Sequence, residues 1–503
     1  MTLEPLAPET RNLIDGALRD ASDGGTFDNV NPATDEVLGT CANATRDDVQ
    51  RAVAAARRAF DQTGWSENHA FRARCLRQLL DGLREAKEQL RSIVVHEAGA
   101  PVSVTPFMQV DGPIEMLDYW AALASSYEYE RRMADIPFLG TQHGRILRRE
   151  AAGVVGAITP WNVPLYLNIA KIGPALAAGC TVVLKPAPDT PWSATHLGKV
   201  VAERTDIPRG VLNIVASADH LVGEILSSDP RIDLVTFTGS TRTGRRIMEC
   251  ASATVKKLFL ELGGKSANIV FKDAHIGNAV KGVVSGIFAA CGQTCVAGSR
   301  LLVERSMHDE FVAKLVELTR AAKLGDPMQP ATQLGPVTNR PQLAKILDYI
   351  AIAKQEGAQA VIGGRRPADE ALQAGWFVEP TIFTGVGNSM RVAREEIFGP
   401  VLSVIPFADE EEAVAIANDS TYGLAAGLWT SDLRRALRLP SRLQVGTVWV
   451  NTYRAMSFMA PFGGYKQSGI GKESGQEMIK DYLQKKTVWL STQEEVPNPF
   501  ILR

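Results

Sequence analysis

A cysteine in the second half of this 503-residue chain has the surroundings of a nucleophile. Cys295 ends the small-residue sequence Gly292-Gln293-Thr294-Cys295, which follows an apolar helical run. A thiol in such a turn could lie exposed and lose its proton, and a thiolate adds readily to a carbonyl carbon. A buried structural cysteine is the alternative, and the residue types alone leave both open.

Two further side chains occupy positions suited to a base and an oxyanion donor. Glu261 ends a strand-like run just before Gly263-Gly264, and α/β proteins build their sites at the carboxyl ends of parallel strands. Asn162 lies in the most apolar stretch of the chain, so its amide needs partners, and an amide N–H suits a developing oxyanion. The structural alternatives are a solvated strand end and a turn amide.

A third pattern concerns phosphate binding. The segment Phe237–Gly244 follows a strand-like run and opens a helix, where glycine and the helix N-terminus favour an anion. It is neither GxGxxG nor a P-loop, because Arg245 and Arg246 replace Lys and Ser/Thr. A simple strand-to-helix turn is therefore the alternative to phosphate binding. Lys185 also ends a strand-like run, although a lone lysine there is usually a surface cation.

A doubly wound parallel sheet would position these side chains. From residue 152 onward, β-rich runs alternate with helical segments, which predicts about five parallel strands. The runs are Val154–Ile158, Thr181–Lys185, Leu212–Val215, Leu234–Phe237 and Leu258–Glu261. The first 125 residues predict mainly helix, and one helix opens with the capping-box residues Thr45 and Asp48.

A second α/β domain is predicted from about Ala274 onward. Its helical runs are Ile276–Ala290 and His308–Lys323, and its strand-like runs are Arg300–Val303 and Leu402–Ile405. The extended runs Gly144–Arg149 and Thr487–Leu490 fit neither sheet. Exposed segments of this kind often pair with another chain.

Composition excludes several functions. There are 54 Lys plus Arg and 56 Asp plus Glu, a net charge of -2, which argues against nucleic acid or an acidic membrane as partner. The six cysteines form no CxxC or zinc-type spacing, so we expect no metal, no disulfide framework and a reducing, cytoplasmic location. The apolar run Ala151–Ala170 contains prolines and asparagines, so it predicts strand, loop and helix, not a membrane span.

Together these motifs resemble the aldehyde dehydrogenase superfamily from about Asn31 to Leu490. The matching segments are PWN, LKP, FTGS, LELGGK, GQxC, EEIFGP and PFGGYKxSG. The resemblance implies that Cys295 is the nucleophile, Glu261 the general base, and Asn162 with the Cys295 backbone amide the oxyanion hole. It implies oxidation of an aldehyde to its carboxylic acid by NAD(P)+ through a cysteine thiohemiacetal and a thioester.

The resemblance also implies where the cofactor binds. Lys185 would contact the adenosine ribose, Trp161, Gly239 and Ser240 the pyrophosphate, and Glu396 and Phe398 the nicotinamide ribose and ring. One position departs from the pattern: many relatives that prefer NAD carry Glu three residues beyond the lysine, where this chain has Pro188. We therefore expect NAD, with NADP left open.

The domain organisation follows from the same resemblance. A Rossmann-like dinucleotide-binding domain would comprise residues 1–128 and 152–263, and an α/β catalytic domain residues 264–467. Residues 129–151 and 481–499 would form a small β oligomerisation element. The implied assembly is a homodimer or a homotetramer.

Alignment to the family also predicts a substrate tunnel. Its lining would be Tyr166, Leu167, Ala170, Thr294, Val296, Met456, Phe458 and Phe462. Ala170 stands where many relatives have Trp, which would widen the tunnel, unless the alanine only accommodates a neighbour such as Tyr166. Because none of the eight is charged, we expect a medium to bulky apolar or aromatic aldehyde in preference to acetaldehyde, glycine betaine aldehyde or succinic semialdehyde.

Two other functions fit the same fold. A coenzyme A acylating dehydrogenase is opposed by Glu261, because relatives that pass the acyl group to coenzyme A lack this carboxylate. A structural or binding protein that has lost its activity is opposed by the intact set of Cys295, Glu261, Asn162 and Lys185.

Overall fold

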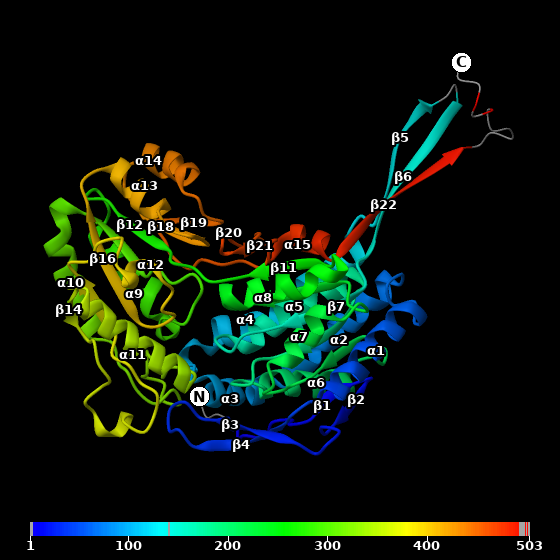
Figure 1. Ribbon diagram of the computed structural model, residues 1–503, viewed down its shortest axis with the longest axis horizontal. Coiled ribbons are helices and arrows are strands. Elements are labelled where there is room, and N and C mark those ends of the chain that lie inside the picture. The colour runs from blue at the N-terminus through cyan, green and yellow to red at the C-terminus, as the bar shows by residue number, and fades with distance from the viewer. Residues whose placement is uncertain (1–3, 139–140, 492–497, 499, 501–503) are drawn as a thin grey trace.

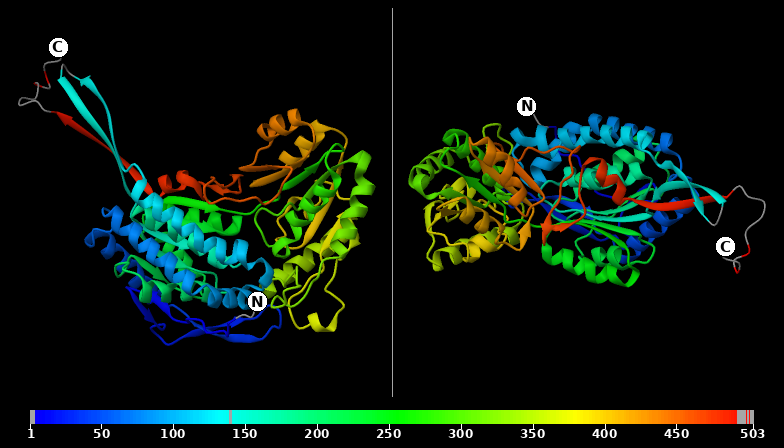
Figure 2. Two further views of the ribbon diagram at one scale, coloured as in Figure 1. Left: turned by 180° about the vertical axis from the view of Figure 1, so that it is seen from behind. Right: turned by 90° about the horizontal axis from the view of Figure 1, so that it is seen from above.

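The computed structural model describes residues 4–138, 141–491, 498 and 500 (Figure 1). Two large sheets carry helices on their faces, and a narrow β-tongue projects away from both (Figures 1 and 2). Residues 492–497 and 499 of the predicted oligomerisation element lie outside the described residues, as do 139–140 and the first three residues. The predicted α/β class is confirmed.

The first sheet has eight strands in the order β2-β1-β9-β8-β7-β10-β11-β21. Its parallel strands, confirmed as predicted, are β7 (Val154–Ile158), β8 (Thr181–Lys185), β9 (Leu212–Ile214), β10 (Leu234–Thr238) and β11 (Lys257–Glu261). The chain proceeds from β7 to β8 and β9 on one side and to β10 and β11 on the other. The carboxyl ends of β7 and β10 therefore form the topological switch point where such sheets bind ligands.

The first 125 residues were predicted to be mainly helical, and this prediction was wrong for the segment before α1 (Arg46–Gln62). Four strands precede the first helix, namely β1 (Asn12–Ile14), β2 (Ala17–Arg19), β3 (Thr26–Val30) and β4 (Val37–Ala42). β1 pairs antiparallel with β9, where Leu13 lies opposite Ile214. Runs this short have no readable periodicity, and they become strands because a sheet edge or a hairpin partner is available.

Helices cover both faces of the first sheet (Figure 2). Before β7 they are α1 (Arg46–Gln62), α2 (His69–Glu85), α3 (Lys87–Ala98) and α4 (Asp111–Ser126). Between and after the parallel strands they are α5 (Pro164–Ala178), α6 (Trp192–Arg204), α7 (Leu221–Ser228) and α8 (Thr241–Ala251). The predicted capping box of Thr45 and Asp48 is present at α1. In the part of the chain that the structure describes, no helix is long and apolar enough to cross a membrane.

The second sheet has seven strands in the order β14-β15-β16-β13-β12-β18-β19. These are β12 (Ala267–Val270), β13 (Arg300–Glu304), β14 (Gln359–Ile362), β15 (Thr381–Thr384), β16 (Val401–Phe407), β18 (Ala425–Trp429) and β19 (Thr447–Val450). Its helices include α9 (Ile276–Phe288), α10 (His308–Arg320), α11 (Arg340–Gln355), α13 (Glu410–Asn418) and α14 (Leu433–Arg438). The predicted second α/β region is thus observed.

After the second sheet the chain returns to the first. Strand β21 (Gly469–Ile470) pairs antiparallel with β11, and α15 (Gly475–Asp481) packs against α5. This return brings residues from the end of the chain beside the carboxyl ends of β10 and β11.

The β-tongue consists of β5 (Glu130–Phe138), β6 (Thr141–Ala151) and β22 (Leu483–Ser491), in the order β22-β6-β5. The two extended runs identified in the sequence face each other in it, with Val488 opposite Ile146. In the described part of the tongue, β5 and β22 each pair on one side only.

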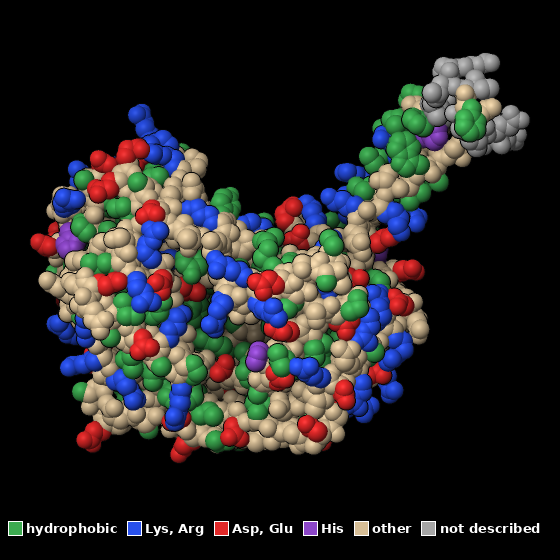
Figure 3. All heavy atoms as spheres, viewed as in Figure 1, with side chains coloured by type: hydrophobic (Ala, Val, Ile, Leu, Met, Phe, Trp, Pro, Cys, Tyr) green, Lys and Arg blue, Asp and Glu red, His purple; other side chains and the backbone are tan. Residues whose placement is uncertain are grey.

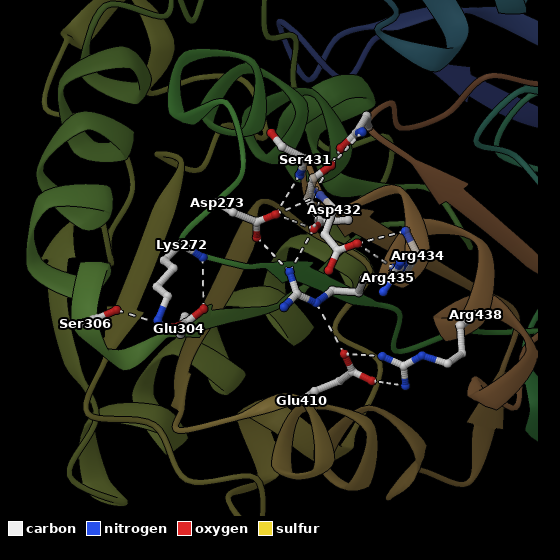
Figure 4. Close-up of polar contacts among 12 residues, drawn as sticks. Lys272, Asp273, Glu304, Ser306, Glu410, Ser431, Asp432, Arg434, Arg435 and Arg438 are labelled. Atoms are coloured by element: carbon white, nitrogen blue, oxygen red, sulfur yellow. Dashed lines mark hydrogen bonds and ion pairs between the residues drawn. The ribbon is translucent and has the colours of Figure 1, made fainter.

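A polar network fixes the turn after β12 to the turn before α14 (Figure 4). Asp273 accepts hydrogen bonds from Thr430 Oγ1 at 2.7 Å and from the backbone amides of Ser431 and Asp432, both at 2.9 Å. It also pairs with Arg435 at 2.8 Å, whose guanidinium lies 4.1 Å from the centroid of the Phe271 ring. Partial burial would raise the pKa of Asp273, but these hydrogen bonds outweigh burial and lower it.

Candidate active site

A cavity of about 440 Å³ lies where loops of both large sheets meet. The space-filling view shows the surface hollowed between the two halves of the molecule (Figure 3). The loop after β7, the loop after β10 and the end of β11 contribute from the first sheet. The turn after α9, the start of α11 and the segment after β19 contribute from the second.

An unusual backbone turn brings Cys295 to this cavity. After α9, the residues Ala290, Cys291 and Gly292 have φ values of 50°, 54° and 70°, all in the left-handed region. A Cβ on Gly292 would lie 2.1 Å from the Gly399 carbonyl oxygen, so only glycine fits there. Backbone strain of this kind persists where surrounding structure enforces it, typically at functional sites.

The surroundings of Cys295 favour the protonated form of its thiol. The side chain is partly exposed to the cavity, but burial and the nearby carboxyl groups of Glu261, Glu396 and Glu473 raise the pKa of the thiol well above its usual value. Loss of the proton is therefore disfavoured in this state, because a thiolate would be desolvated and repelled by these carboxyl groups. Cys295 needs a base at the moment of attack.

Glu261 has the properties of such a base. It ends β11 with 2% of its surface exposed, and neither carboxyl oxygen has a hydrogen-bond partner among the described residues. Burial, and next the Glu473 carboxyl, raise the pKa of Glu261 well above its usual value. A Cβ on Gly264 would lie 2.4 Å from the Cys295 carbonyl oxygen, so this glycine lets the end of β11 pack against the cysteine turn.

A buried ion pair beside Glu261 was not predicted from the sequence. Lys171 on α5 pairs with Glu473, which lines the cavity, and Thr238 Oγ1 donates to Glu473 Oε1 at 3.3 Å. The Lys171 charge opposes the effect of burial on the pKa of Glu261. A lysine within an otherwise apolar helix was the available signal, because a buried cation requires a partner.

Asn162 connects the first sheet to the cysteine turn. It lies in the loop between β7 and α5, lines the cavity, and its Nδ2 donates to the Gln293 carbonyl at 2.8 Å. The Asn162 carbonyl in turn accepts from Gln109 Nε2 at 3.3 Å. An amide nitrogen carries two N–H donors, so one remains for a ligand.

The residues expected near the pyrophosphate and the nicotinamide lie together on the cavity wall. Trp161 and Phe398 meet edge to face with ring centroids 5.4 Å apart. Gln342 Nε2 donates to the Phe398 carbonyl at 3.0 Å and so holds this loop. Gly239 and Ser240 also line the cavity, and Ser240 Oγ caps α8 by accepting from the Thr243 amide at 3.2 Å.

Glu396 lies at the same end of the cavity. Its Oε1 accepts from the Gly264 amide at 2.9 Å. Burial raises the pKa of Glu396, whereas that hydrogen bond and the lysines Lys345 and Lys265 oppose the rise. Lys345 and Gln342 line the cavity from α11 and were missed by sequence reasoning, because that helix carries no recognisable motif.

Lys185 does not line this cavity. It ends β8, and its Nζ donates to the carbonyls of Ser217 at 3.1 Å and Pro186 at 3.3 Å. Burial lowers the pKa of Lys185 to about 8. The lysine thus lies at the carboxyl edge of the sheet, one strand away from β7.

Six of the eight predicted tunnel residues line the cavity: Tyr166, Leu167, Thr294, Val296, Met456 and Phe462. The other two do not. Ala170 lies on the core-facing side of α5 and is 3% exposed, and Phe458 packs against Tyr119 with ring centroids 5.7 Å apart. The short alanine side chain therefore gives no widening at the wall. Val104, Phe107, Met108 and Arg454 line the cavity and were not predicted.

Comparison with known proteins identifies the family of this chain. The model of the aldehyde dehydrogenase family matches residues 19–488. An aldehyde dehydrogenase of Enchytraeus buchholzi is 42% identical, covering 96% of each chain, and the betaine aldehyde dehydrogenase of Bacillus subtilis is 40% identical, covering 94% of this chain and 95% of its own. The chain belongs to the aldehyde dehydrogenase family.

Solved structures extend the comparison to the fold. The betaine aldehyde dehydrogenase of Staphylococcus aureus, crystallised in complex with NAD+, is 37% identical with a TM-score of 0.94. The match covers 98% of this chain and 97% of that chain. The fold of this chain is thus shared, over nearly the whole length of both chains, with a protein crystallised in complex with NAD+.

Proposed function

We propose that this protein oxidises an aldehyde to its carboxylic acid with a nicotinamide dinucleotide. One observation carries the proposal: a cysteine thiol, an unpartnered carboxyl group and an amide donor, Cys295, Glu261 and Asn162, line one cavity. These are the nucleophile, base and oxyanion donor that covalent oxidation of a carbonyl requires.

The first step is attack on the aldehyde. Glu261, with its raised pKa, accepts the thiol proton of Cys295, and the sulfur adds to the carbonyl carbon to form a thiohemiacetal. The oxygen that becomes negative accepts hydrogen bonds from the Asn162 amide and the Cys295 backbone amide. When bound, the nicotinamide accepts a hydride from this carbon, which leaves a thioester on Cys295.

The second step is hydrolysis. Glu261 first releases the thiol proton to solvent and then removes a proton from a water molecule, whose oxygen attacks the thioester carbon. The carbon–sulfur bond breaks, the acid is released, and the Cys295 sulfur regains a proton from Glu261. The buried pair of Lys171 and Glu473 stays beside Glu261 in both steps, and its opposing charges set how readily the carboxyl gains and loses a proton.

The residues present fit a dinucleotide. The switch point of the first sheet lies at the N-terminus of α8, where Gly239 and Ser240 can accommodate an anionic pyrophosphate. Glu396 can accept from ribose hydroxyls, and Lys185 can donate to the adenosine ribose. We infer NAD as the cofactor, supported by the NAD+ complex of the Staphylococcus aureus relative, although Pro188 supplies no carboxylate to repel a 2′-phosphate.

The substrate class follows from the wall of the cavity. Tyr166, Leu167 and Phe462, together with Val104 and Met108, offer apolar surface on the approach to Cys295. Each buried methylene contributes about 0.8 kcal/mol, so larger apolar bodies gain affinity. We therefore infer a medium to bulky apolar or aromatic aldehyde, now on the basis of these residues instead of Ala170.

The experiment that tests the function is a panel of aldehydes assayed by nicotinamide absorbance with NAD and NADP in parallel. We expect reduced cofactor and free acid, with kcat/KM rising from two-carbon to aromatic aldehydes. No cofactor reduction with any aldehyde would overturn the proposal. Formation of an acyl thioester on addition of coenzyme A would replace it with the acylating reaction.

We also propose that the β-tongue mediates assembly into a homodimer or homotetramer. Among the residues that the structure describes, the outer strands β5 and β22 each pair with β6 on one side, and Trp489 and Leu490 on β22 are about half exposed. Such edges are normally covered in proteins. Sedimentation at micromolar concentration should give a dimer or tetramer, and an active monomer would contradict the proposal.

A further inference from the structure

Arg454 is a charged residue of the cavity to which the proposed mechanism gives no task. It lies after β19 in the segment that also carries Met456 and Phe462, and all three line the cavity. Its backbone is held in the left-handed region with φ of 62°. Its Nη1 donates to the Ser285 carbonyl on α9 at 3.1 Å. A guanidinium has five N–H donors, so this bond leaves most of them for a ligand.

Arg454 lies two residues before Met456, in the part of the cavity lining that reaches solvent. Phe107, Val104 and Met456 line the same cavity and are 74%, 38% and 36% exposed, so they mark where it opens to solvent. Phe107 belongs to a π-helical turn, Thr105–Gln109, a local geometry frequent at functional sites. Burial lowers the pKa of Arg454, which shows that its half-buried cation has lost part of its hydration.

In the part of the chain that the structure describes, no carboxylate forms an ion pair with Arg454, and the neighbour whose charge acts on its pKa is Tyr453. Three acidic groups line the cavity, and none of them pairs with Arg454 among the described residues. Glu473 pairs with Lys171, Glu396 accepts from the Gly264 amide near Lys345, and Glu261 has no hydrogen-bond partner among the described residues. The mouth of the cavity therefore combines an apolar wall with an uncompensated guanidinium.

We propose that Arg454 binds a carboxylate at the far end of the substrate, so that the preferred aldehydes have an apolar body with a distal carboxylate. The inference rests on the proposed oxidation of aldehydes and narrows its substrate class. A guanidinium suits this task because it binds a carboxylate with two parallel hydrogen bonds. The eight residues considered in the sequence did not include Arg454, which is why a charged anchor was not expected.

The proposal sets this protein apart from relatives named for cationic substrates. A betaine aldehyde dehydrogenase and an aminoaldehyde dehydrogenase are each 40% identical to the chain. A trimethylammonium or ammonium group near Arg454 would meet a like charge, and like charges in a partly desolvated site repel strongly. Cationic aldehydes should therefore be the poorest substrates of a size-matched set.

The test uses three para-substituted benzaldehydes of similar shape, namely 4-formylbenzoate, its methyl ester and 4-(trimethylammonio)benzaldehyde. For the wild-type protein, kcat/KM should be about 10- to 100-fold higher for the carboxylate than for the ester, the range of a charge-assisted hydrogen bond. It should be lowest for the cation. Equal values for the carboxylate and the ester would overturn the inference.

Variants test whether Arg454 causes the preference for the carboxylate substrate. Arg454→Met should reduce the ratio of kcat/KM for the carboxylate to kcat/KM for the ester to near one. Arg454→Lys should retain part of this preference. Arg434→Met, at an exposed arginine on α14, is the matched control and should keep both the ratio and the activity. A ratio that survives Arg454→Met would overturn the inference. Failure to oxidise any of the three aldehydes would instead overturn the proposed function itself.

Discussion

Glu261 and Asp273 are two carboxyl groups near the carboxyl ends of neighbouring strands in the chain, β11 and β12, yet their surroundings are opposite. Asp273 lies near the surface, where two backbone amides, a hydroxyl group and Arg435 hold it, and its pKa is lowered (Figure 4). Glu261 is buried without a hydrogen-bond partner among the described residues, and its pKa is raised.

The contrast distinguishes carboxyl groups that stabilise the fold from carboxyl groups that serve catalysis. A satisfied carboxylate contributes stability, whereas a buried unsatisfied one costs free energy that the rest of the fold must offset. Perturbed groups of this second kind cluster at active sites. Substitutions at the two places should therefore change different observables.

The largest effect is expected at the nucleophile. Cys295→Ala should lower kcat by at least about 10⁴-fold, because no covalent intermediate can form. Dinucleotide affinity, measured by fluorescence titration, should stay within a few fold. Cys291→Ala, at the neighbouring cysteine of the same turn, is the control and should be mild. Retained oxidation in Cys295→Ala would show that the nucleophile lies elsewhere.

Glu261→Gln should come next, with a steady-state kcat lower by about 10²- to 10⁴-fold. Rapid mixing should show a slowed burst of about one NADH per active site followed by still slower turnover, because both the attack of Cys295 and thioester hydrolysis lack their base. Thermal stability should be unchanged or raised, because a buried ionisable group without a partner has been removed. A lost burst with normal hydrolysis of a preformed thioester would contradict this role.

Asp273→Asn should show the opposite pattern. It disrupts a satisfied network, so the free energy of unfolding should fall by about 1 to 3 kcal/mol, while kcat and KM should not change. Urea denaturation followed by fluorescence measures the first, and the standard assay measures the second. Asp118→Asn, at an exposed site on α4, should leave both unchanged. A change in kcat for Asp273→Asn would contradict the view that Asp273 affects stability and not catalysis.

The smallest expected effect is on how the free energy of unfolding depends on pH. The folded pKa of Asp273 is lowered, so the stability it contributes is present above its unfolded pKa of about 3.9 and is lost as pH falls through the folded value. The folded pKa of Glu261 is raised, so its ionisation destabilises the fold as pH rises from its unfolded pKa of about 4.3.

This pH dependence is measured as the difference in free energy of unfolding between each variant and the wild type at a series of pH values. The advantage of Glu261→Gln over wild type should grow as pH is raised from about 4 to 8, whereas the deficit of Asp273→Asn should shrink at the acidic end. Parallel curves for the two variants would show that the two carboxyl groups do not differ in the way the structure indicates.

The sequence predicted those features that depend on local patterns. The parallel strands β7 to β11 have apolar runs of suitable length, and Cys295, Glu261 and Asn162 stand within recognisable motifs. Strands β1 to β4 were missed, because their conformation depends on the pairing available to them.

Features that depend on distant partners were not predictable in the same way. The partners Lys171 and Glu473 come from segments far apart in the chain, and Gln342 and Lys345 lie on a helix without a motif. Ala170 lies in the core and not in the cavity wall because of how α5 packs, which an alignment does not specify.

The return of the chain to the first sheet has a consequence for biosynthesis. Lys171 and Glu473 are 302 residues apart, and β21, which completes the edge of β11, is also made late. At roughly 5 to 20 residues per second, the ribosome needs about 15 to 60 s to make the intervening chain.

Throughout that interval the emerging first half has a lysine without its counter-ion and a sheet edge without its last strand. Nascent chains in this condition expose surfaces that invite aggregation. We therefore expect the first half to remain incompletely packed on the ribosome, and a chain that stops before Glu473 to lack both a finished core and a working base.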